Sequence, residues 1–445
     1  MLGLFLATAL FREGPPRREP SALVNQLGSV SYQARVSAEA ELARFGREAL
    51  PALSAGKSSH DAEVRARSCS LIARIEDSSL LEPTMIRLDF RDVPLGEAIA
   101  EVNRQSGLGL SLSSEEKPSL SSRRIRLESA EPVSAWRATD ALCRAAGLHP
   151  GSEGPYATAG PGGSLLLLDG PESNPGPTWD SGPFRVRLTS LHSQSEIRLG
   201  PVREALVEPS PPTIRSESRA TREFFLQLVL SAEPRLAISR NGPIRVATAI
   251  DDRGRSLLAP AESSQVLHSA GYFGMSSSST VRLRLDLASP AGCGGRLKLL
   301  RGSIPVLVAM RRPEPLVIPL AGPRGRAYQV GEVDLTILDS VAASGGKPAA
   351  VLLSFRNTPA IGFPPAGGAQ PPRPDSAEQQ VEVLDEQGRI LPWFPSATSQ
   401  DGRESRLTLT LTPRGDLGPP VTLRYHGILK ASTEVPFEFR DLPMP

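Results

Sequence analysis

Cysteine and aromatic residues are both scarce in this 445-residue chain. The three cysteines, Cys69, Cys143 and Cys293, are far apart and odd in number, so the sequence shows neither a disulfide framework nor a Cys-x-x-Cys metal site. We expect Cys69 and Cys143 to lie in helices as buried small hydrophobic residues, whereas Cys293 lies in a glycine-rich loop, where a reactive thiol would have no histidine or metal ligand nearby. Aromatic residues make up only 5% of the chain, so the cores must consist mostly of leucine, valine and alanine.

The chain also lacks an excess of charge of either sign. Its 50 basic and 48 acidic residues nearly cancel, which argues against a protein that binds nucleic acid along its whole length. Only five of the basic residues are lysine, and the rest are arginine. A GC-rich genome explains this bias, and an arginine-rich face for phosphate or carboxylate is the alternative. The even spread of arginine along the chain favours the genomic explanation.

Long hydrophobic runs are absent, and no stretch approaches the ~20 apolar residues of a membrane-spanning helix. Residues 1–11 are apolar and uncharged up to Phe11, and Ala7-Thr8-Ala9 resembles a signal-peptidase site. The segment lacks a basic start and is short, so two interpretations stay open: a shortened export signal or a plain hydrophobic tail. We expect a periplasmic or other extracytoplasmic location, and a cytoplasmic one stays open.

Proline and glycine are plentiful, with 43 and 39 residues, and predict many turns and extended segments. The length suggests about three domains. We predict a multidomain chain with a small all-α segment, an α+β module of order β-α-β-β-α-β-β, and two all-β antiparallel sandwiches. The predicted boundaries are an export signal and tail at 1–19, a helical segment at 20–82, the α+β domain at 83–170, a Pro/Gly linker at 171–183, and sandwiches at 184–325 and 326–445.

The helical segment is predicted from amphipathic spacing between about residue 21 and residue 77. Asp61 is a plausible N-cap for a helix that reaches Ile75, with apolar residues on one face. Segments 49–53 (ALPAL) and 61–67 (DAEVRAR) resemble the HEAT-repeat family. That resemblance implies stacked helix pairs, but only about two units fit here. We expect them to pack on the next domain, and a surface that docks a partner is the alternative.

The α+β module is predicted from two strand–helix patterns in residues 83–170. Segment 88–95 (LDFRDVPL) with Ala98-Ile99 and Gly107-Leu108, and later Ala141-Leu142 with Gly147-Leu148, resembles the short N-terminal domain of secretins and TonB-dependent receptors. The resemblance implies a non-catalytic domain for protein–protein contacts in the bacterial periplasm. The pore and receptor roles do not follow, because no outer-membrane barrel follows in this chain.

Alternating strands fill the rest of the chain and resemble tandem immunoglobulin-like β-sandwiches. Two pairs of segments suggest a duplication: 250–255 (IDDRGR) matches 384–389 (LDEQGR), and 304–306 (IPV) matches 435–437 (VPF). Asp-x-x-Gly predicts a hairpin turn, and proline within a strand suits an edge or a bulge. Residues 358–375, rich in proline and glycine, predict a long surface loop.

Motifs for catalysis are missing from the sequence. The histidines are dispersed without metal-ligand spacing: His60, His149, His192, His268 and His426. Asp251-Asp252 and Asp385-Glu386 are paired carboxylates, for which we prefer solvated turns to Ca²⁺ or acid/base sites. The glycine-rich residues 160–163 predict a hairpin rather than a phosphate loop. His192 near Ser190, Ser193 and Glu196 is the nearest approach to a nucleophile cluster, and we attribute it to chance.

We therefore expect a non-enzymatic scaffold or adaptor of the bacterial envelope that binds other envelope proteins. We assign no catalytic, cofactor-binding or metal-binding residue, no cofactor, no nucleic acid and no small-molecule ligand. The alternative is a polysaccharide-binding or accessory module of an extracytoplasmic enzyme system, which exposed aromatic platforms would favour. The three tryptophans, Trp136, Trp179 and Trp393, support that alternative only weakly.

Overall fold

The computed structural model describes most of the chain. The described residues are 19–112, 117–151, 165–172, 176–197, 220–258, 279–288, 294–312, 314–330, 333–341, 343, 348–356, 380–401, 404–412 and 417–444. The expected export signal, the hairpin at 160–163, Cys293, His268 and the loop at 358–375 lie outside them. The described part of the chain is mostly β, with 48% of the described residues in strands, several antiparallel sheets and few helices, as the multidomain α+β and β prediction requires.

The chain divides into two compact units, one ending at Leu81 and the other beginning at Glu82. The helices of the first unit are α1 (Pro20–Gln26), α2 (Tyr32–Phe45), the 3₁₀ turn η1 (Gly46–Ala49), α3 (Leu50–Gly56) and α4 (Ala62–Leu81). Among the described residues, no helix combines the length and the apolar character needed to cross a membrane.

The helical unit, residues 19–81, contains two helix pairs that begin their second helix in the same way. Asp61 accepts a hydrogen bond from the Glu63 amide at 2.8 Å, which confirms it as the N-cap of α4. Ser31 is the equivalent cap of α2. Arg35 and Arg65 each donate to two carbonyl groups of the preceding turn. One set of local contacts therefore builds both pairs, and leucine residues from all four helices fill the core between them.

The second unit starts with the α+β module, residues 82–172. Its elements are β1 (Met85–Ile86), β2 (Asp89–Pro94), α5 (Leu95–Ser106), β3 (Ser111–Leu112), α6 (Lys117–Ser121), β4 (Arg124–Glu128), β5 (Val133–Ser134), α7 (Ala135–Ala146), β6 (Leu148–Pro150) and β7 (Leu166–Asp169). The strands pair as β1-β5, β2-β4 and β3-β7-β6. Helices α5 and α7 end at Gly107 and Gly147, both in the left-handed region that glycine favours.

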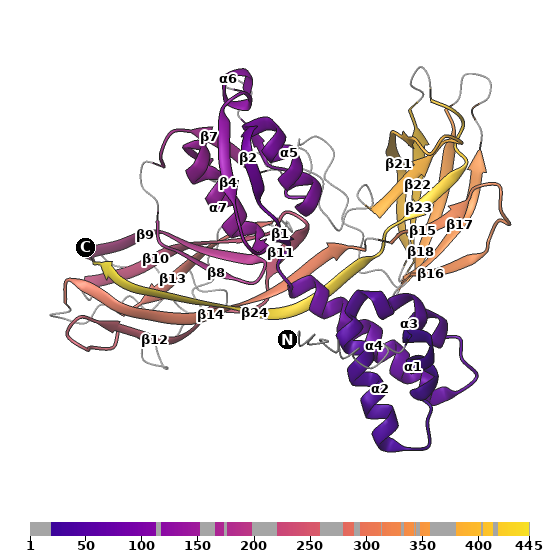
Figure 1. The fold of residues 1–445 in the computed structure, drawn as a ribbon, viewed down its shortest axis with the longest axis horizontal. Helices are drawn as coiled ribbons and strands as arrows, with labels where there is room; N and C mark the ends of the chain where they lie inside the picture. Colours follow the sequence, from indigo (N-terminus) through magenta and orange to yellow (C-terminus); the bar gives the residue numbers. More distant parts are fainter. Residues whose placement is uncertain are drawn as a thin grey trace, which may run out of the picture. The chain divides into compact units, whose positions relative to one another are not determined.

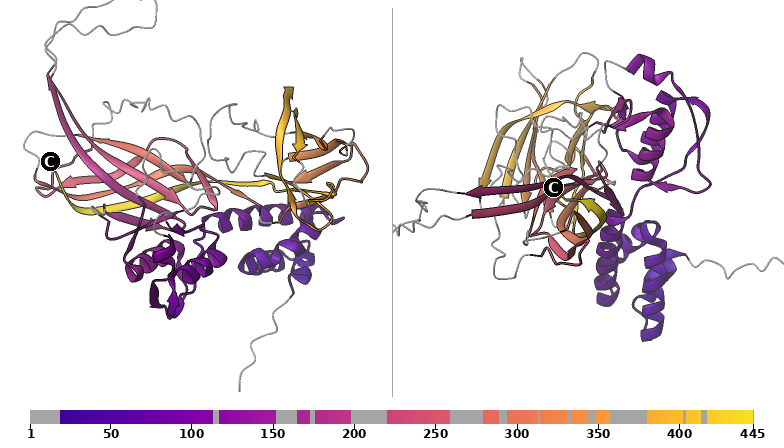
Figure 2. Two further views of the ribbon diagram at one scale, coloured as in Figure 1. Left: turned by 90° about the horizontal axis from the view of Figure 1, so that it is seen from above. Right: turned by 90° about the vertical axis from the view of Figure 1, so that its left-hand side faces the viewer.

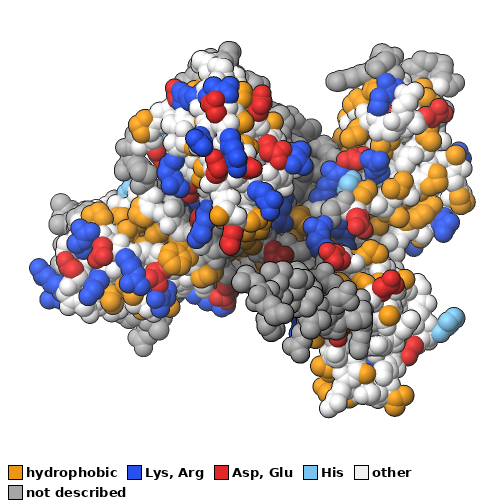
Figure 3. Space-filling model, viewed as in Figure 1, with side chains coloured by type: hydrophobic (Ala, Val, Ile, Leu, Met, Phe, Trp, Pro, Cys, Tyr) orange, Lys and Arg blue, Asp and Glu red, His pale blue; other side chains and the backbone are white. Residues whose placement is uncertain are grey.

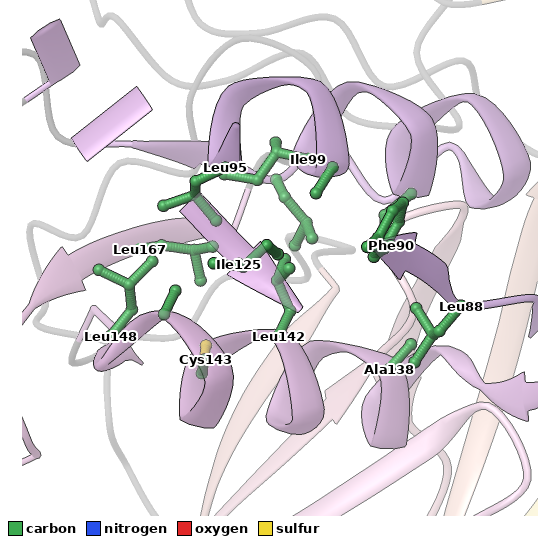
Figure 4. Packing of buried hydrophobic residues seen from close by; sticks show 14 of the residues in the cluster. Leu88, Phe90, Leu95, Ile99, Ile125, Ala138, Leu142, Cys143, Leu148 and Leu167 are labelled. Atoms are coloured by element: carbon green, nitrogen blue, oxygen red, sulfur yellow. The ribbon is translucent and has the colours of Figure 1, made fainter. Parts of the chain in front are cut away.

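The core of the α+β module lies between its two main helices. Figure 4 shows side chains of α5, such as Ile99, and of α7, such as Leu142, pointing toward strand residues including Ile125 and Leu167. The apolar residues of each helix recur at the spacing of one helical face, which explains why both helices cover the strands.

The remaining strands form four antiparallel sheets. Their bounds are β8 (Thr178–Ser181), β9 (Phe184–Ile197), β10 (Ala220–Ala232), β11 (Leu236–Arg240), β12 (Arg245–Asp251), β13 (Thr280–Leu287), β14 (Arg296–Arg311), β15 (Leu316–Pro319), β16 (Ala327–Val330), β17 (Val333–Val341), β18 (Ala350–Arg356), β19 (Val381–Leu384), β20 (Ile390–Leu391), β21 (Trp393–Asp401), β22 (Glu404–Leu411), β23 (Thr422–Tyr425) and β24 (Ile428–Pro443). The sheets do not clearly show immunoglobulin-like sandwiches.

We call strands β8 to β14, together with β24, the first β region. One of its sheets has the order β13-β10-β9-β8, and the other pairs β14 with β11, β12 and β24. Figure 2 shows β9 and β10 as a long curved hairpin. Strands β15 to β23 form the inserted β region, with sheets β15-β23-β19-β20 and β16-β17-β18-β22-β21.

The last strand returns to the first β region. The sequence-based boundaries place β24 with residues 326–445, but it pairs with β14 along almost its whole length, from Arg296–Pro443 to Arg311–Ile428. Figure 1 shows the two strands side by side. The inserted β region therefore lies, in the chain, between two adjacent strands of one sheet.

The two pairs of repeated segments have different structural meanings. Asp251 and Asp385 occupy matching turns, since each side chain accepts from the amides two and four residues later. Ile304 and Val435, by contrast, are direct partners across β14 and β24. The second match thus marks neighbouring strands of one sheet.

Candidate functional site: a charged junction

A buried arginine joins the α+β module to the first β region. Arg185 lies near the start of β9, where the sequence alternates apolar and charged residues, and its side chain is only 7% exposed. Helix α7 explains this burial, because Trp136 and Asp140 of α7 contact the side chain. A buried guanidinium needs charged partners and full hydrogen bonding, since an unpaired one is costly.

Two carboxylates hold Arg185 from opposite modules. Its Nη1 and Nη2 atoms donate to the two Asp140 carboxylate oxygens, both at 2.7 Å. Its Nε and Nη2 atoms donate to Asp180 of β8 at 2.7 and 2.9 Å. The guanidinium carbon lies 5.0 Å from the centre of the Trp136 ring, in cation–π geometry. Arg185 is therefore clamped by a carboxylate from each module and an aromatic face.

The electrostatics keep this arginine charged. Burial by itself lowers the pKa of the Arg185 guanidinium, but the hydrogen bonds to Asp180 and Asp140 outweigh burial and raise the pKa above its ordinary value. The clamp is therefore a permanent ion cluster, and its guanidinium does not exchange protons as an acid or base would.

A second polar cluster extends the junction. Glu233, 1% exposed, follows β10 and accepts from the Thr84 amide at 2.9 Å and the Thr84 hydroxyl at 2.6 Å. Arg235 Nε donates to Glu233 at 2.9 Å and to the Thr84 hydroxyl at 3.1 Å. The carbonyl of Pro183 connects the two clusters, because it accepts from Trp136 Nε1 at 3.1 Å and from the Glu233 amide at 2.9 Å.

A cavity of about 20 Å³ lies beside the clamp, and Trp136, Thr139, Arg185 and Val229 contribute to its lining. A cavity of that size holds about one water molecule. The geometry of the junction thus suits fixation of one module against another, and this cavity leaves no room for a substrate.

The histidines that the structure describes, His60, His149, His192 and His426, lie on separate elements of the chain. His60 lies in the helical unit, His149 Nδ1 lies 2.8 Å from the Gly170 carbonyl, and His426 Nδ1 lies 3.1 Å from the Arg312 carbonyl. Among the described residues, no group of three or more His, Cys, Asp or Glu side chains is arranged to hold a metal ion.

The structure brings together Ser190 and His192, two members of the group that we attributed to chance in the sequence. Ser190 Oγ lies 2.7 Å from His192 Nε2 and 3.2 Å from Gln227 Oε1. The rings of His192 and Phe225 stack, and the Arg284 guanidinium carbon lies 3.8 Å from the Phe225 ring centre. Ser190 and His192 are two residues apart on one strand, so the pleat alone places them on one face. Among the side chains that the structure describes, no third group donates to or accepts from the His192 ring to orient it as the base of a catalytic triad.

The first residue of each paired carboxylate, Asp251 and Asp385, is buried in its turn, so the prediction of solvated turns is wrong for these two, whereas Asp252 and Glu386 are exposed. Burial raises the pKa of Asp251, but backbone hydrogen bonds, led by the one from Gly294, outweigh it and lower the pKa. Burial also raises the pKa of Asp385, but hydrogen bonds from Arg389 and Gly418 outweigh it and lower the pKa. The turns themselves are confirmed, because Gly254 and Gly388 close them with positive φ angles.

Cysteine and tryptophan also take structural positions. Burial raises the pKa of the Cys143 thiol to about 12, and Asp140 adds to the effect. Cys143 is therefore an unreactive core residue of α7, as expected, whereas the prediction of a buried residue is wrong for Cys69, which is exposed on α4. Trp136 is buried in the clamp, and Trp393 donates from Nε1 to the Val381 carbonyl at 3.3 Å. Trp179 is partly exposed on β8.

Sequence reasoning missed Arg185, Asp140 and Asp180. The alternation in β9 places Arg185 on the outer face of a sheet, where arginine is ordinarily solvated. The residue is buried because α7 packs over that face, and no local sequence pattern predicts this contact.

No family model, curated protein or solved structure matches this chain.

Proposed function

We propose that the chain is a non-enzymatic scaffold or adaptor that acts through protein–protein contacts. The observation that carries the proposal is the Arg185 clamp, in which charged groups of two modules bind each other completely. Such a junction fixes the α+β module on the first β region. A fixed module presents its free surface in one orientation, which lowers the entropy cost of binding a partner.

The free surface of the α+β module supports a protein partner. The outer face of strands β2 and β4, which we call the charged ribbon, carries both signs of charge. Its exposed residues are Asp89, Arg91, Asp92, Arg124, Arg126 and Glu128. Figure 3 shows basic and acidic side chains interspersed over the face where Figure 1 places β2 and β4. Alternating charge favours a complementary protein surface over a uniformly negative nucleic acid.

The sequence resemblances agree with this proposal. The helical unit resembles HEAT repeats, and the α+β module resembles the short N-terminal domain of secretins and TonB-dependent receptors, which both serve protein contacts. On that basis we place the protein in the bacterial envelope, outside the cytoplasm.

Site-specific photo-crosslinking in the source cells tests the proposal. The full chain carries a photoreactive amino acid at Arg126 on the charged ribbon or, as a comparison, at Arg406 on β22, and both side chains are well exposed. We expect a protein adduct of defined mass at Arg126. Reversing the neighbouring charge with Arg91→Glu should abolish it, whereas Arg440→Glu on β24 should leave it intact.

The alternative is a module that binds polysaccharide, and partly exposed Trp179 and Phe394 favour it. They lie on different β regions, on β8 and β21, so they do not form one platform. Retention of the chain on cell-wall polysaccharide, with no protein adduct at either position, would replace the first proposal with this one. Absence of both retention and adducts would contradict both.

A further inference from the structure

The inserted β region is joined to the first β region by two adjacent antiparallel segments. One runs from β14 through Arg312 to β15, and the other from β23 through His426 and Gly427 to β24. The Arg312 amide donates to the Gly427 carbonyl at 2.8 Å where they cross. Gly427 is required there, because a Cβ atom would lie 2.6 Å from Val330 Cγ1.

The described strands of the two β regions share little direct packing. Among the described elements, no strand of the inserted β region packs extensively on a strand of the first β region. Domains that share only a small interface move relative to each other by default. Two adjacent connections, hydrogen-bonded to each other, restrict that motion mainly to bending where they meet.

One carboxylate bridges this crossing. Glu382 of β19 accepts a short hydrogen bond from Arg311, the last residue of β14. His426 Nε2 lies 3.4 Å and Arg424 Nη1 lies 3.9 Å from the other Glu382 oxygen. Burial raises the pKa of Glu382, but Arg311 outweighs it and lowers the pKa, so the carboxylate is charged at neutral pH. Arg311 belongs to the first β region, whereas Glu382 belongs to the inserted one.

We propose that the inserted β region swings on this two-stranded hinge, and that the Glu382–Arg311 ion pair acts as a latch that sets its resting angle. The crossing backbone supplies the pivot, at Arg312 and Gly427. The latch holds because solvent and salt screen this ion pair less than a fully exposed one, since the Glu382 side chain is only 20% exposed.

Distances between spin labels test the latch in the full chain. Labels at Lys298→Cys on β14 and Ile390→Cys on β20 report the angle between the regions, in a background with Cys69→Ser and Cys293→Ser. We expect the distance distribution to shift and broaden in Glu382→Gln. The matched control is Glu438→Gln, which loses ion pairs with Arg301 and Arg440 inside the first β region and should leave the distribution unchanged.

Two further measurements keep the test decisive if Glu382→Gln does not fold. Arg311→Gln removes the same pair from the other side, and the unaltered chain in about 1 M salt, where the Debye length is about 3 Å, weakens the pair without mutation. Broadening in these samples supports the latch. Distributions identical to that of the unaltered chain would overturn it, as would equal broadening in Glu438→Gln.

Discussion

The buried charged residues of this protein each hydrogen-bond several partners. Arg185 binds two aspartates, and Asp385 accepts from three backbone amides and the Arg389 guanidinium. Multiple hydrogen bonds offset the loss of hydration that burial imposes. These charged groups are therefore paired with opposite charges or backbone amides within the fold.

Removing the clamp should destabilise the protein. Arg185→Gln leaves Asp140 and Asp180 without their cation and should lower the free energy of unfolding by about 3 kcal/mol, the low end for a broken buried pair, since both carboxylates reach solvent. Urea unfolding followed by tryptophan fluorescence measures the change. Arg440→Gln, which removes an arginine that is 67% exposed, should change the midpoint little. Equal effects of the two variants would contradict the clamp.

The turn carboxylates should make stability depend on pH. The pKa of Asp385 is lowered by folding, so its contribution is present above its unfolded pKa, about 3.9, and is lost as the pH falls through the folded value. Asp385→Asn should therefore destabilise the chain at pH 7, because its NH₂ group faces the Gly418 amide or the Arg389 guanidinium. The difference from the unaltered chain should shrink below pH 4.

Thermal unfolding over pH 2.5 to 8, a range chosen to bracket the ordinary aspartate pKa of about 3.9, measures this effect. The control is Glu386→Gln in the same turn, whose side chain is exposed. A difference that persists unchanged at low pH would refute the role of the Asp385 charge.

At the scale of elements, local signals are strongest in the helices. Asp61 as an N-cap and glycines after α5 and α7 are visible in the sequence because each acts on its own helix end. The strands were visible from alternation, but their partners were not. β24 is an example. Its alternation identifies it as a strand, but its partner β14 is separated from it in the sequence by the whole inserted β region.

The pairing of β24 with β14 predicts which strands a substitution in β24 destabilises. Phe437 is buried in the first β region, where its ring packs against Gly302. Phe437→Ala should lower the free energy of unfolding of that region by about 3–5 kcal/mol, because it leaves a cavity. Hydrogen exchange should show lost protection in β10 and β14.

The same experiment carries its own control. Strands β18 and β22 of the inserted β region should keep their protection. They are closer to Phe437 in the sequence than β10 and β14 are, but they belong to a different sheet. Loss of protection in β18 and β22 rather than in β10 would contradict the observed pairing.

The cap of α4 gives a smaller, local prediction. Asp61→Ala removes the acceptor for the Glu63 and Val64 amides and should cost about 1 kcal/mol of stability. Asp61→Asn, which keeps an acceptor oxygen, should recover most of that loss. Thermal unfolding of both variants measures the effect, and equal losses would argue against a capping role.

For the whole molecule, several carboxylates act in the same direction on acid stability. The pKa values of Asp251, Glu382, Asp385, Glu404 and Glu438 are all lowered in the folded chain. Each contributes stability above its unfolded pKa, near 4, and each loses it as the pH falls further. Stability of the full chain should therefore fall steeply below pH 4. A thermal midpoint that stays constant from pH 6 to about 3 would contradict this sum.

The sequence alone determined the kind of element at most positions, because helix caps, terminating glycines and alternation act within a few residues. It also located the Asp251 and Asp385 turns, whose geometry is local. Only the tertiary structure decided that Arg185 is buried, that Asp251 and Asp385 are shielded from water, and that β24 completes a sheet begun before the inserted β region. These features depend on contacts between residues far apart in the chain, and a periodic pattern carries no information about which distant surface will cover it.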